Sequence, residues 1–380
     1  MRAAPAGHCS GPIIVGLVGA LVILVLVLGD LASHGAPLVS LIQPGSRGPA
    51  AALLGHDFPE QRFPPIQGND GQQFYAMARA PMHPSVVARS LDRPRYRLQR
   101  PGYPALAWLL HPSGGGNGLI IALLTANVAA VALVTGALAS WALICRRSQW
   151  WGLVAALIPG AFVTVRISCA DMLAAGLALA AAVSFLRRRI VLAAALAAAA
   201  ALTKEPSLIL VTGVALMQWR TRARDVVAVV APAVCVTALL FIVLVSAFPI
   251  THSQYNEITV PLRGLADSAT YWGETSDWRP ALTVLATLLL SFAALRRNLA
   301  SAFSLAVAAY LGMALVQSMG TLAFWSSAPR TLYPLALCTA ASLLGRGRRL
   351  ELAGAVAAVE GPGQASPTTI SPPLSRQPRR

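Results

Sequence analysis

Charged side chains are scarce in this 380-residue sequence, at 12% of all residues. A soluble domain carries roughly 25%, so the shortage excludes an ordinary soluble protein and favours lipid as the main solvent. Acidic residues are the scarcest, with 14 Asp and Glu against 30 Lys and Arg. In a soluble protein the net charge of +16 would suggest nucleic-acid binding, but here the arginines form short clusters between apolar runs. No basic patch interleaved with aromatic residues occurs, so nucleic acid is not expected as a partner.

Cysteine and histidine are also few, and their spacing excludes two kinds of site. Four of the five cysteines lie in or beside apolar runs, where they are small hydrophobic residues and not a disulfide framework (Cys145, Cys169, Cys235 and Cys338). No HExxH or CxxC spacing occurs, so a dedicated zinc site is not expected. The apolar run 13–28 lacks a small-x-small cleavage site at its end, which favours an uncleaved first span over a signal peptide.

Long apolar runs are what the sequence has in abundance, with 56% hydrophobic residues and a mean hydropathy of +0.62. A stretch of about 20 apolar residues crosses the bilayer core, where backbone groups must pair internally and therefore form helices. The sequence thus predicts an all-α, polytopic transmembrane helix bundle with about ten spans, at 12–29, 119–144, 150–165, 169–186, 190–203, 206–219, 226–248, 280–295, 299–318 and 332–345. Pro206 suits the first turn of its span, although a re-entrant hairpin is an alternative for the short pair 190–203 and 206–219.

Arginine clusters follow alternate spans, at 146–147, 187–189, 220–224, 296–297 and 346–349. Because positive charge marks cytoplasmic loops, we expect a multi-pass protein of the plasma membrane with both termini in the cytoplasm. This order places every acidic residue except Asp225, Glu351 and Glu360 on the outer side. The polar chemistry is therefore expected there, although longer outer loops alone would give the same bias.

The spans divide the chain into six parts. These are a first span at 1–29, an extracytoplasmic loop at 30–118, a transmembrane bundle at 119–248, a second extracytoplasmic loop at 249–279, C-terminal spans at 280–345 and a cytoplasmic tail at 346–380. The first loop is far longer than a connection requires, and its aromatic residues predict a folded loop with interfacial helices at 71–80 and 103–110. The tail, rich in Pro and Ser over 361–380, is expected to be mostly disordered.

The densest polar cluster lies in the first outer loop. Asp70 sits between Asn69 and Gly71, where it is either a helix cap or a carboxylate available as a general base or metal ligand. Arg95, Arg97 and Arg100 follow, and their planar guanidinium groups suit a phosphate, or alternatively contact lipid headgroups. Pro94 and Pro101 leave little room for a helix between them.

Further charged residues stand at the outer ends of other spans. They are Arg166, Asp171, Lys204, Glu205 and Arg330. Each alone can be explained as a loop charge or a snorkelling side chain. Together they predict a ring around an outward-opening cavity, because ionisable groups near the membrane tend to mark sites.

Two segments of the first loop carry a family resemblance. Their patterns are Asp70-Gly71-Gln72-x-Phe74-Tyr75 and Asp92-x-Pro94-x-Tyr96-Arg97-x-Gln99-Arg100-x-x-Tyr103-Pro104. They resemble bacterial membrane proteins related to the C-type glycosyltransferases, as do the Lys204-Glu205 turn and the Arg330-x-x-x-Pro334 segment. The resemblance covers the plan of residues 1–345 but is specific over about 35 residues. Many relatives carry two adjacent carboxylates where Asp57 and Asp70 each stand alone.

The resemblance implies transfer of a sugar from a polyprenyl-phosphate donor to a glycan, lipid or protein acceptor on the outer face, by an inverting displacement. Asp70 matches the catalytic carboxylate, and it would hold a divalent cation if one takes part. The residues expected to bind the substrate are Tyr75, Asp92, Arg97, Arg100, Arg166, Asp171, Lys204, Glu205 and Arg330. A transporter or lipid flippase is the alternative, but it predicts ionisable residues near mid-membrane and repeated halves, which the sequence lacks. A non-catalytic membrane scaffold is the third reading.

Overall fold

The computed structural model describes residues 10–112, 114–248 and 257–345. Within these ranges the chain forms eighteen α-helices and four 3-10 helices, with no strand beyond one isolated antiparallel bridge between Ile258 and Gln317. The predicted all-α fold is confirmed for this part of the chain. The predicted disordered tail 346–380, the arginine cluster 346–349 and Cys9 lie outside the described residues.

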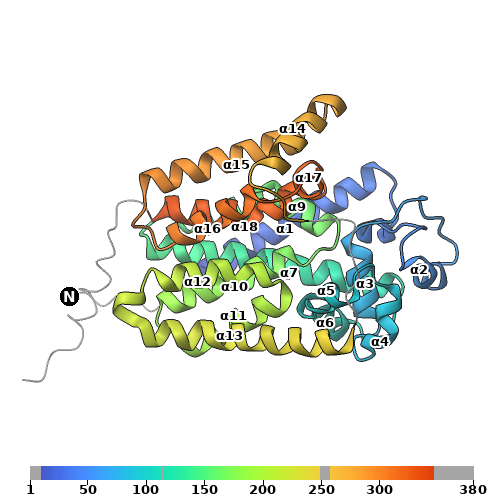
Figure 1. The fold of residues 1–380 in the computed structure, drawn as a ribbon, viewed down its shortest axis with the longest axis horizontal. Helices are drawn as coiled ribbons and strands as arrows, with labels where there is room; N and C mark the ends of the chain where they lie inside the picture. The colour runs from blue at the N-terminus through green and yellow to red at the C-terminus, as the bar shows by residue number, and fades with distance from the viewer. Residues whose placement is uncertain (1–9, 113, 249–256, 346–380) are drawn as a thin grey trace, which may run out of the picture.

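The helices of the bundle lie side by side along the long axis of the molecule (Figure 1). In chain order they are α1 (Ser10–Ser33), α7 (Asn117–Ile144), α10 (Asp171–Leu186), α11 (Ile190–Thr203), α12 (Leu208–Leu216), α13 (Trp219–Ala247), α15 (Trp278–Arg297), α16 (Ser304–Leu315) and α18 (Ala328–Leu344). Small residues let the helices approach closely. A Cβ added to Gly16 of α1 would lie 2.6 Å from the carbonyl oxygen of Ala132 in α7, as is typical of helix packing in membranes.

Four of the helices, α1, α7, α13 and α15, are long and apolar enough to cross a membrane. The apolar helices α10, α11, α12 and α16 are shorter. Large side chains such as Leu17, Leu239 and Leu289 are 61%, 62% and 69% exposed along the outside of α1, α13 and α15. Exposed apolar stripes of this kind suit a lipid environment and not water.

Each of the ten predicted spans contains helix, but three of them differ from the expectation. The helix within the span 299–318 is α16, which has twelve residues. The span 150–165 is broken into η3 (Gln149–Leu153), α8 (Val154–Leu157) and α9 (Pro159–Arg166). Ile158 is extended there, with φ −65° and ψ 125°, because proline disfavours the helical conformation in the residue before it. The span 206–219 begins with the 3-10 turn η4 (Glu205–Ser207), and α12 itself has nine residues.

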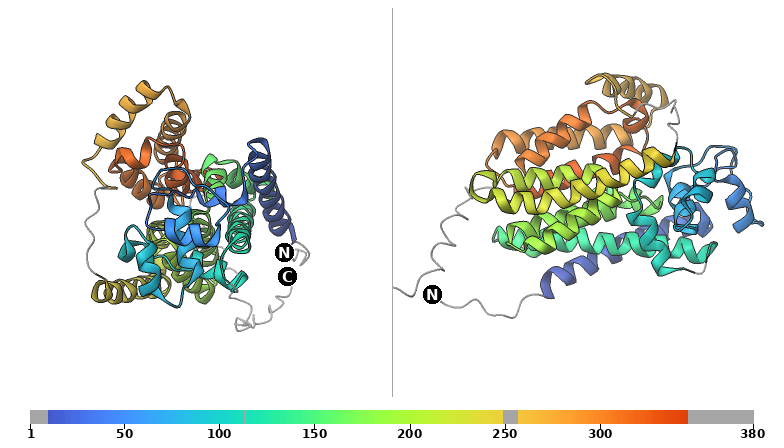
Figure 2. Two further views of the ribbon diagram at one scale, coloured as in Figure 1. Left: turned by 90° about the vertical axis from the view of Figure 1, so that its right-hand side faces the viewer. Right: turned by 60° about the horizontal axis from the view of Figure 1, so that its bottom comes forward.

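The long loop 30–118 folds into short helices at one end of the bundle, shown in blue and cyan at the right of Figure 1 and facing the viewer in Figure 2, left. They are η1 (Leu38–Ile42), α2 (Ala51–Asp57), α3 (Asp70–Arg79), α4 (Pro84–Val87), η2 (Ala88–Ser90), α5 (Pro94–Leu98) and α6 (Gly102–Leu110). Helices α3 and α6 confirm the two predicted loop helices. Helix α5 was not expected, but Pro94 occupies its first turn, where a proline needs no N–H partner.

The two ends of the bundle carry different features. The described arginine clusters 146–147, 187–189, 220–224 and 296–297 lie at helix ends opposite the long loop (Figure 1). The helix α14 (Arg263–Thr275) and the short α17 (Met319–Leu322) lie near the loop end. This division agrees with the alternation of arginine clusters on which the predicted topology rests.

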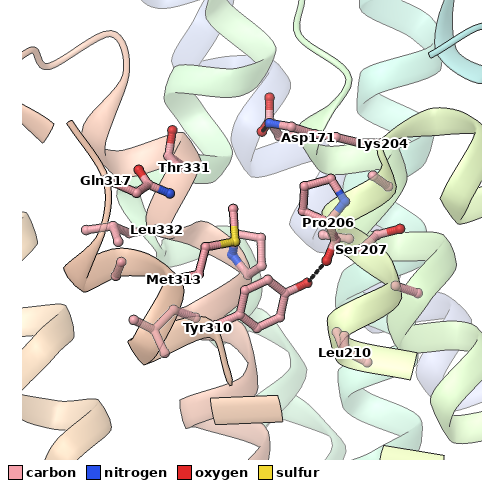
Figure 3. A pocket seen from close by; sticks show the side chains of 16 residues that line it. Asp171, Lys204, Pro206, Ser207, Leu210, Tyr310, Met313, Gln317, Thr331 and Leu332 are labelled. Atoms are coloured by element: carbon pink, nitrogen blue, oxygen red, sulfur yellow. Dashed lines mark hydrogen bonds and ion pairs between the residues drawn. The ribbon is translucent and has the colours of Figure 1, made fainter. Parts of the chain in front are cut away.

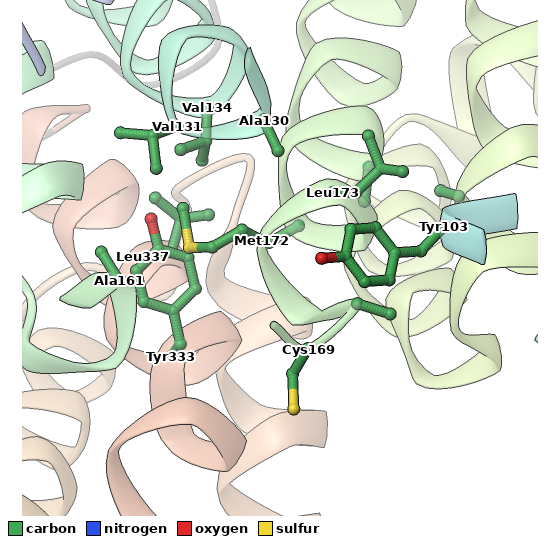
Figure 4. Close-up of a cluster of buried hydrophobic side chains, with 14 of the residues drawn as sticks. Tyr103, Ala130, Val131, Val134, Ala161, Cys169, Met172, Leu173, Tyr333 and Leu337 are labelled. Atoms are coloured by element: carbon green, nitrogen blue, oxygen red, sulfur yellow. The ribbon is translucent and has the colours of Figure 1, made fainter. Parts of the chain in front are cut away.

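A core of buried side chains supports the loop end of the bundle. Tyr103 of α6, Met172 of α10 and Tyr333 of α18 converge there with small residues of α7 (Figure 4). The Tyr103 hydroxyl donates to the carbonyl of Leu123 at 3.0 Å, and Asn127 donates to that hydroxyl at 2.8 Å. These contacts anchor the loop helix α6 to α7, and so fix the loop against the bundle.

Candidate functional site

Asp70 is the first residue of α3, but it is not the cap of that helix. Asn69 is the N-cap, and its side-chain oxygen accepts a hydrogen bond from the Asp70 N–H at 2.7 Å. The interpretation of Asp70 as a cap is therefore wrong. Because Asn69 satisfies the helix end, the Asp70 carboxylate is left for other partners.

Two arginines hold the Asp70 carboxylate, one on each oxygen. Arg97 Nη1 lies 2.8 Å from Oδ1, and Arg330 Nη2 lies 2.6 Å from Oδ2. Burial alone would raise the pKa of Asp70, but the guanidinium groups of Arg97 and then Arg330 outweigh it and hold that pKa well below its usual range. The Asp70 side chain is still 21% exposed, although each of its oxygens faces a guanidinium group.

The ion pairs continue from Asp70 in both directions. On one side Arg97 donates from Nε and Nη2 to the two oxygens of Asp92, each at 2.8 Å. On the other side Arg330 Nη1 lies 3.5 Å from Asp171 Oδ2, and Lys204 Nζ donates to Asp171 Oδ1. Three carboxylates and three cations thus alternate in one connected series, which we call the ion-pair chain (Asp92, Arg97, Asp70, Arg330, Asp171 and Lys204). Buried charges need such pairing because an unpaired one is costly.

A second group of charges surrounds Tyr96 on α5. The guanidinium carbons of Arg93 and Arg100 lie 4.3 and 4.1 Å from the centre of the Tyr96 ring. The Tyr96 hydroxyl donates to Glu257 at 3.1 Å, and Arg93 donates to the same carboxylate at 2.8 Å. Arg100 donates to Glu205 Oε2 at 3.0 Å, while Glu205 Oε1 is buried without a hydrogen-bond partner.

Helix α5 and the residues that flank it are thus tied to three separate segments through arginines. Arg93 reaches Glu257, which precedes α14, Arg97 reaches α3, and Arg100 reaches the turn before α12. The predicted headgroup contact does not describe Arg97 and Arg100, because both are buried. Sequence reasoning missed Glu257 as a site residue. The spacing of 93, 96, 97 and 100, which matches the i, i+3, i+4 and i+7 positions of one helix face, was the available signal for the cluster, although α5 itself covers only Pro94–Leu98.

Two predicted site residues lie outside both groups. The Tyr75 hydroxyl donates to Asp57 at 2.6 Å and accepts from the Gly116 N–H at 2.6 Å. Arg166 donates to Asp30 at 2.6 Å and to the carbonyl of Ser40 at 3.0 Å. In both cases the partners tie parts of the first loop together, and the structure does not bring these residues to Asp70.

A cavity opens among α10, α12, α16 and α18, with about 580 Å³ of atom-free space that includes open solvent. Asp171, Lys204, Gln317 and Thr331 lie at one end of it, while Leu210 and Tyr310 lie at the other (Figure 3). The remaining lining is mostly apolar. Because Asp171 and Lys204 belong to the ion-pair chain, the polar end of the cavity is connected to Asp70 through Arg330. Of the five residues expected to ring a cavity, Asp171 and Lys204 line this one, and Arg330 contacts Asp171.

The residues around Asp70 do not suit a divalent cation. Each Asp70 oxygen faces a guanidinium group, and a hard cation needs several oxygen ligands instead. Within the described ranges no group of three or more His, Cys, Asp or Glu side chains is placed to hold a metal ion.

No family model, no curated protein and no solved structure matches this chain. The resemblance of the two outer-loop segments therefore remains an expectation.

Proposed function

We propose that the chain is a multi-pass enzyme of the plasma membrane that transfers a sugar from a polyprenyl-phosphate donor to a cell-envelope acceptor on the outer face. In this proposal the ten predicted spans cross the membrane, both termini are cytoplasmic, and the long-loop end of the bundle is outside. The observation that carries the proposal is the cavity, which is apolar along most of its length and ends at Lys204 and Asp171 of the ion-pair chain.

The shape of the cavity suits the donor's two unlike parts. A prenyl chain is apolar and gains from contact with side chains such as Leu210 and Leu335. Its phosphate is an anion and needs cations at the end of that apolar path. Lys204 lines the cavity, and Arg330 lies next to it through Asp171. Both cations would stabilise the negative charge that grows on the phosphate as it leaves.

The reaction breaks the bond between the sugar's anomeric carbon and the phosphate oxygen, and the electron pair stays on the phosphate. The acceptor hydroxyl oxygen forms the new bond to the anomeric carbon from the opposite side. Its proton passes to a carboxylate within hydrogen-bond reach. Asp70 is proposed for this role because its side chain is partly exposed. It is also separated from Asp171, which lines the cavity, by a single residue, Arg330.

Asp70 is a weak base while two arginines hold it, because its pKa is lowered. A donor phosphate would compete with Asp70 and Asp171 for Arg330. Loss of that guanidinium would raise the Asp70 pKa toward its ordinary value and free Oδ2 to accept a proton. Donor binding would thus activate the base, and an empty site would remain inactive.

A transporter or lipid flippase is the alternative, and a non-catalytic scaffold is a third. Transport across the bilayer favours ionisable groups near mid-membrane. The charged residues of this cavity are Asp171, the first residue of α10, and Lys204, the residue after α11, so they stand at helix ends. Their position favours chemistry at one membrane surface.

A transfer assay tests the proposal. Membranes that contain the protein are incubated with radiolabelled polyprenyl-phosphate hexose or pentose, and label is followed into acceptor. Wild type should transfer label and Asp70→Ala should not. Movement of intact donor between leaflets without transfer would favour the flippase, and no effect of the protein on either would favour the scaffold.

A further inference from the structure

Gln317 stands at the polar end of the cavity with an unmet hydrogen-bonding requirement. Its side chain lines the cavity, the residue is 6% exposed, and its Oε1 atom is buried without a partner. A buried amide oxygen without a hydrogen bond is costly. Such an atom at the wall of a cavity is a feature that a bound ligand would satisfy.

The backbone at Gln317 is held firmly, so the amide is presented from a fixed position. Ile258 forms an antiparallel bridge with Gln317, and the neighbouring backbone bonds are Thr259 N–H to Val316 at 2.7 Å and Ser318 N–H to Glu257 at 2.9 Å. Helix α14 also packs against this backbone through Gly264. A Cβ added there would lie 1.9 Å from the carbonyl oxygen of Gln317, so only glycine permits the contact. Rigid support of this kind is what a binding group requires.

The polar groups at this end differ in charge. Lys204 and Asp171 are paired ions, whereas Gln317 and Thr331 are neutral (Figure 3). A phosphate prefers charged donors and is served by Lys204. An amide both donates and accepts hydrogen bonds, and so matches the hydroxyl groups of a neutral, polyhydroxylated ligand.

We propose that Gln317 and Thr331 form a subsite that recognises hydroxyl groups of the donor's sugar ring. The proposal rests on the proposed function, since it takes the phosphate to lie at Lys204 and the prenyl chain along the apolar walls. Gln317 is then a specificity-determining residue: it distinguishes a sugar-bearing lipid phosphate from the bare lipid phosphate that remains after transfer. This difference would help the spent lipid to leave.

A binding comparison tests the subsite. Purified full-length protein in lipid nanodiscs is titrated with farnesyl phosphate and with farnesyl phosphate esterified to a hexose or a pentose. Wild type should bind at least one sugar ester more tightly than farnesyl phosphate. Gln317→Met and Thr331→Val, which keep side-chain size, should each weaken that ester about three- to tenfold, the loss expected for one neutral hydrogen bond. Binding of farnesyl phosphate should not change.

Gln218→Met is the matched control. Gln218 also has a buried amide atom without a partner, but it lies before α13 at the opposite end of the bundle and does not line the cavity. Its substitution should leave both affinities as in wild type.

Four results would overturn the subsite. Equal affinity of wild type for the esters and for farnesyl phosphate, or no effect of Gln317→Met, would mean that the Gln317 amide meets only water, and the donor proposal would stand. Equal weakening of both lipids by Gln317→Met would assign Gln317 to the shape of the cavity. If wild type binds none of these lipids, the proposed function fails as well.

Discussion

Arg97 and Arg100 differ in how their guanidinium groups are engaged. All three nitrogens of Arg97 face carboxylate oxygens of Asp70 and Asp92, so we expect Arg97 to position Asp70. Arg100 contacts Glu205 through Nε and stacks on Tyr96, so it is the better candidate for a donor contact. Arg97→Lys should lower both the unfolding temperature and kcat, because one ammonium cannot replace a bidentate pair.

Arg100→Lys should instead raise the KM for the donor several-fold with little change in kcat. Thermal unfolding in detergent and donor-dependent kinetics of the two variants separate these effects. If both variants behave as wild type in the transfer assay, neither guanidinium contributes to the site.

The lowered pKa values of Asp70 and Asp92 predict how stability depends on pH. For Asp92, burial is outweighed by the hydrogen bonds and charge of Arg97, as it is for Asp70. A carboxyl with a lowered folded pKa contributes stability that is complete above its unfolded pKa of about 3.9 and is lost as the pH falls toward the folded value. The unfolding temperature should therefore drop below about pH 4. Asp70→Asn should show a smaller drop over that range, and a drop of unchanged size would show that Asp70 is not ionically paired.

The residue types of the site were predictable from the sequence, but their pairing was not. Asp70, Asp171, Lys204 and Arg330 stand out as charges at the outer ends of apolar runs. Nothing in the sequence indicates that Asp70 meets Arg330, because the contact depends on where the fold places the start of α3 relative to the start of α18. Tyr75 and Arg166 carry the same kind of signal, yet nearer partners, Asp57 and Asp30, hold them elsewhere.

Among the helices, α3 and α6 were predictable, whereas α5 and the break in the span 150–165 were not. The boundaries of α3 and α6 agree with the expectation within about one residue. In α3 polar and apolar positions alternate with the helical period, whereas α6 is apolar along most of its length. Two expectations that concern proline were wrong. It begins α5 at Pro94, where a break was expected, and it interrupts the span 150–165 at Pro159, where a continuous helix was expected.

Helix α5 offers a test of what attaches the first loop to its neighbours. The Tyr96 ring lies between two guanidinium groups, and each contact of this kind stabilises by about 0.5–2 kcal/mol. Tyr96→Phe keeps both ring faces and loses only the hydroxyl bond to Glu257, which is 49% exposed. Tyr96→Leu loses the ring as well. The unfolding temperature should therefore fall clearly more in Tyr96→Leu than in Tyr96→Phe. An equal fall would assign the attachment to the hydroxyl bond.

For the molecule as a whole, the proposed topology places the long loop outside and the arginine clusters inside. Single cysteines at Glu60, Arg89 and Ala266, all exposed, can be introduced after alanine replaces the native cysteines. All three should react with a membrane-impermeant thiol reagent in intact cells. A cysteine at Arg297, exposed at the opposite end of the bundle, is the control and should react only after the cells are opened.

The reverse labelling pattern would invert the proposed orientation. If Arg89 and Ala266 do not lie on the same side, the number of crossings between them is odd, and the ten-span order is wrong. A re-entrant hairpin at 190–219 would leave this pattern unchanged, since it alters the count by two crossings.

The central claim is that Asp70 takes part in sugar transfer and is not merely a member of an ion network. Asp92 shares Arg97 with Asp70 and is therefore its matched control. The decisive measurement is the rate of transfer from radiolabelled polyprenyl-phosphate sugar in membranes with equal amounts of wild type, Asp70→Asn and Asp92→Asn. Loss of a general base typically costs about 10²–10⁴ in rate, so Asp70→Asn should fall by that factor and Asp92→Asn by about tenfold or less. Transfer by Asp70→Asn at more than about a tenth of the wild-type rate, or equal losses in the two variants, would contradict the account.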